Sequence, residues 1–282
     1  MMIPVLDRFA PLAAAYDALL CDAWGVIHNG VDLFDGAAEA MRRFRAERGP
    51  VVILTNAPRP SAVIPPQLDR LGLPRDAYDA IVTSGDATRA AIAARIPAPA
   101  FRLGPAKDEA LYDDLDVAFA PIEEAGFIIC TGLFDDVGDA LEDYDALLDD
   151  AGARGLTMIC ANPDIVVNYG GRLIYCAGAL AERYAARGGD VVYAGKPHPP
   201  IYDLAFDKLK EARGEVSRVL AVGDGLQTDI LGANHARIDA AYIFGAGGVG
   251  EPGAADDLEN AISAALDGAG VRAVAALERL VW

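Results

Sequence analysis

The chain is poor in basic residues and in histidine. It contains 24 Lys and Arg against 42 Asp and Glu, with three His, so its formal net charge is -18. Nucleic acids and anionic membrane surfaces bind proteins through Lys and Arg, and this balance argues against both as partners. An acidic chain can still bind a small phosphorylated molecule where a cation lies in the site. We therefore expect a small-molecule partner, no nucleic acid and no membrane.

Cysteine is also scarce, and its positions follow no metal-binding pattern. The four residues are Cys21, Cys130, Cys160 and Cys176, and no two of them form a C-x-x-C pair. Three of them end apolar runs, which is typical of small buried side chains in a reducing compartment. With three histidines and no clustered thiols, the sequence argues against a zinc site.

Long hydrophobic segments are missing as well. No stretch approaches the ~20 apolar residues that cross a bilayer. The N-terminus shows no basic region followed by an apolar segment, the pattern of a signal peptide. These observations predict a cytoplasmic protein. The 282 residues are 53% hydrophobic, enough for one large core or two smaller ones.

Short apolar runs alternate with helical patterns along the chain. The runs lie at 17–21, 51–54, 80–83, 191–194, 219–222 and 240–244, and a loop with glycine or polar residues follows each. Between them, as at 37–48 and 200–213, apolar residues recur at helical spacing. This alternation predicts an α/β fold with a parallel sheet and crossover helices.

The middle of the chain has strand-like and helical segments of its own. Strand-like runs lie at 100–103, 117–120, 126–130 and 156–160, and helical patterns lie at 137–148 and 176–187. We therefore predict an α/β domain at 84–190, inserted into a core domain formed by 1–83 and 191–282.

Polar side chains suited to phosphate chemistry follow four of the apolar runs. They are Asp22, then Thr55 with Asn56, then Lys196, then Asp224 with Asp229. Because the carboxyl ends of parallel strands meet at one edge of a sheet, these residues should share a crevice. Carboxylates bind a hard cation, and hydroxyl, amide and ammonium groups hold phosphoryl oxygens. The set predicts magnesium-assisted phosphoryl transfer to a carboxylate.

In this order the residues resemble the haloacid dehalogenase superfamily. Its signature is a nucleophilic Asp in a D-x-D motif, then Thr or Ser, then Lys, then an acidic G-D pair. "TSGDATRAAI", "ANPD" at 161–164, and "CAGALAERY" before "AGKPHPPIY" look like the NagD-like branch (class IIA), which has an inserted α/β cap. The resemblance implies a Rossmann-like core, the inserted cap, bound Mg2+, and phosphatase activity on small phosphate esters. Homodimers occur in this branch.

The resemblance also implies roles for single residues. Asp22 would be the nucleophile, assisted by Lys196 and Thr55. Thr55, Asn56 and Lys196 would hold the phosphoryl group. The metal ligands would be Asp22, the carbonyl oxygen of Trp24, Asp224 and Asp229. Asn162 and Asp164, in the cap, would lie near the substrate.

Trp24 departs from the family pattern. The second Asp of D-x-D protonates the leaving group and activates water, and an indole does neither. General acid–base catalysis is typically worth ~10²–10⁴-fold in rate. His28, six residues after Asp22, is a candidate acid/base, and Trp24 could instead pack against the cap.

Three functions stay open at this point. The chain could be a phosphatase, weakened or redirected by Trp24. It could be an inactive relative that binds a phosphorylated ligand. It could use Asp22 on another bond, such as carbon–halogen. The acidic pair Asp224 and Asp229 favours a metal, hence phosphate.

A glycine-rich match near the C-terminus is not a nucleotide site. "GAGGVG" at 245–250 fits G-x-G-x-x-G. A dinucleotide fold needs a further strand and an acid ~20 residues on, whereas a helical pattern follows here. We therefore reject a nicotinamide site.

Overall fold

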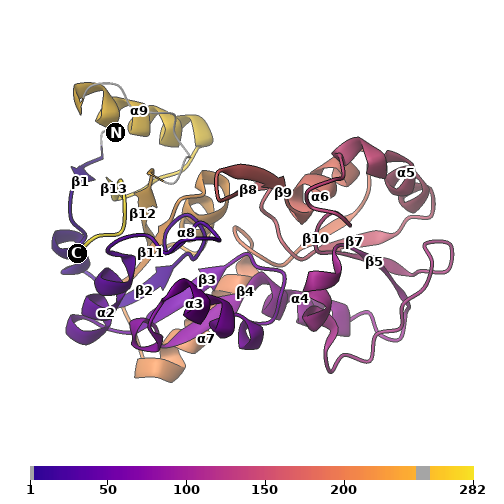
Figure 1. The fold of residues 1–282 in the computed structure, drawn as a ribbon, viewed down its shortest axis with the longest axis horizontal. Helices are drawn as coiled ribbons and strands as arrows, with labels where there is room; N and C mark the ends of the chain where they lie inside the picture. The colour runs from indigo at the N-terminus through magenta and orange to yellow at the C-terminus, as the bar shows by residue number, and fades with distance from the viewer. Residues whose placement is uncertain (1–2, 246–254) are drawn as a thin grey trace.

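The computed structural model describes residues 3–245 and 255–282, and contains two parallel sheets side by side (Figure 1). The larger sheet has seven strands. Their order is β1 (Val5–Leu6), β13 (Ala275–Leu277), β12 (Asp239–Ile243), β11 (Val219–Gly223), β2 (Ala18–Cys21), β3 (Val51–Thr55) and β4 (Ala80–Thr83). Every pair of neighbours is parallel, as the sequence predicts.

The central strands of this core sheet are buried on both faces, which explains their continuous apolar runs. On one face, Leu19 and Ile53 pack with Phe44 of α2 (Ala37–Glu47) and with α3 (Pro65–Leu71). On the other face, Leu20 and Val52 pack with α7 (Pro199–Arg213) and α9 (Ala255–Ala269). Alternate residues of one strand therefore point to opposite faces of the sheet and pack into the two halves of the core.

The smaller sheet and its helices form a unit inserted after β4, which we call the cap (residues 84–193). Its strand order is β10 (Val191–Tyr193), β7 (Thr157–Cys160), β6 (Phe127–Cys130) and β5 (Ala100–Leu103). One face packs against α5 (Asp145–Ala153) and α6 (Ala177–Ala185). The other face packs against α4 (Ser84–Ala93) and the 3-10 segment Ala106–Tyr112.

An antiparallel hairpin, β8 (Val166–Tyr169) and β9 (Arg172–Tyr175), lies between the two sheets (Figure 1). Its turn is Gly170-Gly171, with φ of +55° and +90°. Two successive positive φ angles suit the tight turns of β-hairpins and favour glycine. The hairpin was not predicted, although a Gly-Gly pair between two β-prone runs is the signal for one.

Three predicted elements differ from the structure. β10, predicted as a core strand, pairs with β7, so the cap sheet extends past the predicted boundary at residue 190. The run 117–120 forms no strand, and Phe119 contributes a single bridge to Ala100. Within 137–148, a 3-10 turn (Leu141–Tyr144) precedes α5. A short apolar run cannot indicate by itself which sheet it joins.

The shorter elements complete the chain. They are α1 (Ala10–Ala13), the 3-10 turns Ser61–Val63 and Arg75–Ala77, the π-helical turn Leu226–Ile230, and α8 (Leu231–His235). Most of the rejected glycine motif, residues 246–250, lies outside the described residues. Among the described residues, no helix is long and apolar enough to cross a membrane.

The order of the core strands places a crevice at β2. The chain runs from β2 through β3 to β4 on one side, and from β11 through β12 to β13 on the other. Ligands of open α/β sheets bind beyond the carboxyl ends of the strands where the order reverses in this way. Asp22 follows β2 directly, so it lies at this point.

Candidate active site

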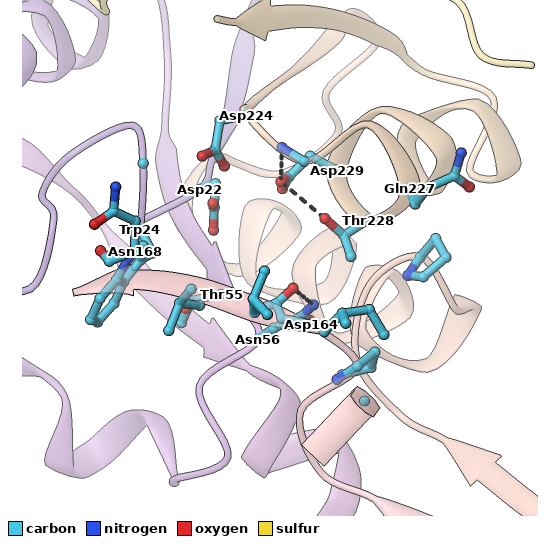
Figure 2. A pocket seen from close by; sticks show the side chains of 18 of the residues that line it. Asp22, Trp24, Thr55, Asn56, Asp164, Asn168, Asp224, Gln227, Thr228 and Asp229 are labelled. Carbon is cyan, nitrogen blue, oxygen red and sulfur yellow. Dashed lines mark hydrogen bonds between the residues drawn. The ribbon is translucent and has the colours of Figure 1, made fainter. Parts of the chain in front are cut away.

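The predicted residues of the core converge on one cavity. Asp22 follows β2, Thr55 ends β3, and Asp224 follows β11. They line a cavity of about 800 Å³ together with Asp164 of the cap and Asp229 (Figure 2). Adjacent parallel strands thus bring together residues that are up to two hundred positions apart in sequence.

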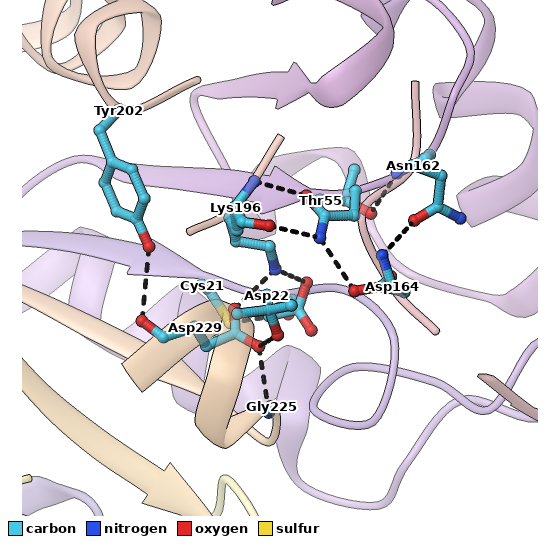
Figure 3. A network of polar contacts seen from close by, with 12 residues as sticks. Cys21, Asp22, Thr55, Asn162, Asp164, Lys196, Tyr202, Gly225 and Asp229 are labelled. Carbon is cyan, nitrogen blue, oxygen red and sulfur yellow. Dashed lines mark hydrogen bonds and ion pairs between the residues drawn. The ribbon is translucent and has the colours of Figure 1, made fainter. Parts of the chain in front are cut away.

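Lys196 lies buried between two carboxylates (Figure 3). Its Nζ is 2.6 Å from Asp22 Oδ1 and 2.6 Å from Asp229 Oδ1, and the residue is 2% exposed. Burial opposes the charged ammonium, but the carboxylates of Asp22 and Asp229 outweigh it and raise the pKa of Lys196 well above its ordinary value. The lysine therefore remains a cation in the site.

Asp22, Asp224 and Asp229 form a cluster suited to a metal ion. Each offers a carboxylate oxygen, and these oxygens lie within 4.8 Å of one another. Burial, then the charge of Asp229, raises the pKa of Asp22 well above its usual range and that of Asp224 to about 8. A cation bound among the three acids would offset the burial and repulsion that raise these pKa values, and an all-oxygen donor set fits a hard cation such as Mg2+.

Gly25 makes room for this cluster. Its φ is +84°, and a Cβ at this position would lie 1.9 Å from Asp224 Oδ2. Both the backbone conformation and the close approach therefore require glycine. Gly25 also donates its N–H to the carbonyl of His28 at 2.8 Å, which closes the loop after β2.

The side chain of Asn56 braces the site, and the phosphate contact predicted for this residue stays a prediction. Its Oδ1 accepts from the Lys196 N–H at 2.7 Å. Its Nδ2 donates to the Lys196 carbonyl at 3.2 Å and to Asp164 Oδ1 at 2.9 Å, which uses both amide hydrogens. Asn56 thereby ties the end of β3 to the Lys196 loop and to the cap.

Asn162 and Asp164 enter the site from the cap. Asn162 Oδ1 accepts from the Asp164 N–H at 3.1 Å and so fixes the loop after β7. Asp164 is partly exposed to the cavity. Burial raises the pKa of its carboxyl, opposed by Lys196 and by the hydrogen bond from Asn56.

Trp24 packs against the cap hairpin, which confirms one of its two predicted roles. Its Nε1 donates to the carbonyl of Asn168 on β8 at 3.0 Å, and both residues are labelled in Figure 2. Its ring centroid lies 5.9 Å from that of Tyr169. Nearby, the Gly170 N–H donates to the Asn29 carbonyl at 3.3 Å. The loop after β2 is therefore held directly to the cap.

His28 occupies a different environment from the one expected of an acid/base. It is 3% exposed, and its Nδ1 accepts from the Gly30 N–H at 3.0 Å. Burial lowers its pKa to about 4, so the ring is neutral at pH 7. Its ring packs edge-on against Trp24 at 5.3 Å. These contacts describe a structural histidine of the loop.

Comparison with known proteins identifies the family. A model described as haloacid dehalogenase-like hydrolase matches residues 19–118, and a second, HAD-hydrolase-like, matches residues 193–268. A crystal structure of a hydrolase of the haloacid dehalogenase-like family from Brucella suis 1330 is 42% identical. It covers 98% of this chain and 100% of its own, with a TM-score of 0.88. The chain belongs to the haloacid dehalogenase-like family.

Other members of the family that resemble this chain are phosphatases. The D-glycerol 3-phosphate phosphatase of Mycobacterium tuberculosis is 29% identical over 83% of this chain, which spans 64% of that enzyme's length. A solved structure of a glycerol phosphate phosphatase from the same organism, in complex with magnesium, is 26% identical with a TM-score of 0.61. The match covers 83% of this chain and 69% of that one.

We predict that Mg2+ stabilises the protein through the acidic cluster. At a concentration ~100 times its Kd, a ligand that binds only the folded state contributes ~2.7 kcal/mol, which is on the order of 5 °C in Tm for a chain of this size. Asp224→Asn should remove most of this increment, because it removes a ligand and a charge. Calorimetry with Mg2+ and with a chelator measures it.

Asp207→Asn is the matched control, since Asp207 is an exposed aspartate of α7 away from the cluster. It should retain the full increment. Equal increments in Asp224→Asn and the parent would show that the cluster does not hold the metal.

Proposed function

We propose that the protein is a Mg2+-dependent phosphatase that acts on small phosphate esters through an aspartyl-phosphate on Asp22. The observation that carries the proposal is the buried contact of Asp22 with Lys196, beside the cluster formed with Asp224 and Asp229. The phosphatase activity of the relatives supports it. Their substrates suggest the size of the ester, a small phosphorylated metabolite.

The first step is attack by an Asp22 carboxylate oxygen on phosphorus. The Thr55 hydroxyl and the Lys196 ammonium hold the phosphoryl oxygens, where charge develops. Asp22, Asp224, Asp229 and the carbonyl of Trp24 would hold Mg2+, which when bound offsets the negative charge of the phosphoryl group. The P–O bond to the organic group breaks, and the leaving oxygen takes up a proton.

Position 24 raises the question of where that proton comes from. The motif here is D-x-W, and neither the indole of Trp24 nor the neutral, buried His28 supplies a proton at pH 7. Asp164 is a carboxyl on the wall of the same cavity, outside the acidic cluster, and burial raises its pKa. Glu182 also lines the cavity but is exposed on α6.

Asp164 therefore takes over the acid role in this proposal. Its carboxyl gives a proton to the leaving oxygen, and the alcohol departs. The resulting carboxylate takes a proton from the water that attacks the aspartyl-phosphate, which releases inorganic phosphate and regenerates Asp22. The sequence predicts that Asp164 contacts the substrate phosphate. We assign it proton transfer instead, because an ionised carboxylate would repel a phosphate dianion.

One alternative rests on a specific observation. Trp24 fills the position of the usual acid and fastens the loop to the cap, as expected of a relative that binds a phosphorylated ligand without hydrolysing it. The carbon–halogen alternative lacks such support, because a metal-binding acidic cluster serves phosphate chemistry.

A burst experiment separates these possibilities. Mixing the protein and Mg2+ with excess p-nitrophenyl phosphate should release one equivalent of p-nitrophenol per protein before the steady state. Nitrophenolate leaves without protonation, so hydrolysis of the aspartyl-phosphate limits turnover and the intermediate accumulates. Rapid acid quench should trap phosphate on the protein, labile to hydroxylamine. Asp22→Asn should abolish both signals. Binding of the ester without burst or turnover would identify a binding protein.

A second experiment tests Asp164. Asp164→Asn keeps an oxygen that can accept from Asn56 but loses the acidic proton. We predict that the rate of phosphoryl transfer to Asp22 from an alkyl phosphate such as glycerol 3-phosphate, measured in a single turnover, falls by ~10²-fold or more. The burst rate with p-nitrophenyl phosphate should change little, because nitrophenolate leaves without protonation, whereas steady-state turnover of both esters should fall because Asp164 also activates the water.

Rescue of Asp164→Asn by a second substitution distinguishes a role of Asp164 in proton transfer from a structural role. Adding Trp24→Asp to Asp164→Asn returns a carboxyl to the family position and should restore at least tenfold on the alkyl ester. Trp24→Phe, which removes the indole without adding an acid, should not. Equal losses of the phosphoryl-transfer rate on the alkyl and aryl esters, or no rescue, would assign Asp164 to binding or folding.

A further inference from the structure

A second cavity adjoins the active site at Trp24. Its volume is about 420 Å³, within the range of roughly 300–1,000 Å³ typical of small-ligand sites. Segments of the core and of the cap both line it. Four residues line both cavities, namely Trp24, Thr55, Asp164 and Val167. The organic group of a phosphate ester held at Thr55 would therefore lie close to the second cavity.

The second cavity contains an acid with an unmet hydrogen-bonding requirement. Asp108, in the 3-10 segment Ala106–Tyr112, is 2% exposed. Its Oδ1 lies 3.8 Å from Arg59 Nε, beyond hydrogen-bonding distance. Its Oδ2 has no hydrogen-bond partner among the residues that the structure describes. Burial raises the pKa of Asp108 to about 6, so it is mainly ionised at pH 7.

An unpartnered buried carboxylate oxygen is costly to the protein. A ligand that donates a hydrogen bond to Oδ2 would relieve this cost and gain affinity from it. The aspartate therefore selects for a donor, such as a hydroxyl or an amino group, on whatever occupies the cavity.

Two of the three basic side chains of the lining already have partners, which argues against a second anionic group on the ligand. The basic residues are Arg59, Arg70 and Lys107, and the acids are Asp108, Asp136 and Asp164, of which Asp164 carries a proton in the proposed mechanism. Lys107 pairs with Asp136, and Arg59 Nη2 donates to Gln67 Oε1 at 2.7 Å. The remaining walls are largely apolar or aromatic, with Ile64, Leu68, Tyr169, Ile174 and Tyr175 among them.

We propose that this second cavity is the subsite for the organic part of the substrate, an uncharged apolar skeleton whose hydroxyl or amino group donates to Asp108. The inference rests on the proposed phosphatase function, since it assumes that the phosphoryl group lies at Asp22. Trp24 then acts as a wall of the subsite as well as a contact of the hairpin, which gives a reason for a large aromatic side chain at this position.

Matched aryl phosphates test the subsite. 4-(Hydroxymethyl)phenyl phosphate and 4-ethylphenyl phosphate have nearly the same shape and phenol leaving group, but only the first carries a donor. The meta isomers extend the comparison to a second direction. For the para pair or the meta pair, kcat/KM of the parent should be about tenfold higher for the hydroxymethyl ester than for the ethyl ester. This ratio is what one hydrogen bond to a charged group typically contributes.

Asp108→Ala removes the acceptor, and the ratio between the two esters should fall to one or below. Asp108→Asn, which keeps a neutral acceptor, should give an intermediate ratio and serves if the alanine variant does not fold. Glu109→Ala, an exposed neighbour in the same segment, should keep the parent's ratio. A parent without preference, or a preference that survives Asp108→Ala, would overturn the proposal.

Binding measurements keep this test separate from the proposed function. If the parent hydrolyses none of the esters, the phosphatase proposal fails, and calorimetry of both esters on the same proteins decides the subsite. About tenfold tighter binding of the hydroxymethyl ester, lost in Asp108→Ala, would support the subsite. Equal affinities would refute it.

Discussion

The contact of the Lys196 ammonium with Asp22 and Asp229 is the interaction on which the site depends. Taking such ions out of water costs several kcal/mol each, and removing one partner of a buried pair leaves an uncompensated charge. The lysine offsets part of the repulsion among three clustered acids, and at the same time holds the proposed nucleophile, Asp22, and the proposed metal ligand Asp229 in place. Its own backbone is fixed by Asn56, so hydrogen bonds join the end of β3 to the loop after β10.

The same bracing connects the chemistry to the cap. Asn56 donates to Asp164, and Trp24 donates to the hairpin strand β8, so two residues of the core hold two parts of the cap over the cavity. In a site of this kind the cap completes the set of catalytic groups and excludes water from the reaction. The departure of Trp24 from the family pattern is compatible with this arrangement, because a carboxyl supplied by the cap can carry the proton that position 24 does not.

Much of the core was predictable, because position in a parallel sheet follows from local pattern. Asp22, Thr55 and Asp224 each lie at the end of a buried run, and the strand order brings them together. The sheet that β10 joins was not predictable, since a run of three apolar residues fits the core sheet and the cap sheet equally well. The bracing role of Asn56 depends on contacts with Lys196, 140 positions away, that no local pattern contains. The hairpin could have been predicted from Gly170-Gly171, and the second cavity could not, because it forms only where the core and the cap meet.

A structure of the protein with Mg2+ and beryllium fluoride tests the central claim most directly, since this reagent forms a stable mimic of an aspartyl-phosphate. The account predicts a beryllium fluoride group bonded to an Asp22 carboxylate oxygen, contacted by Thr55 Oγ1 and Lys196 Nζ, with the metal among Asp22, Asp224 and Asp229. An adduct on another residue, or an Asp22 that stays unmodified while Mg2+ occupies the cluster, would contradict it.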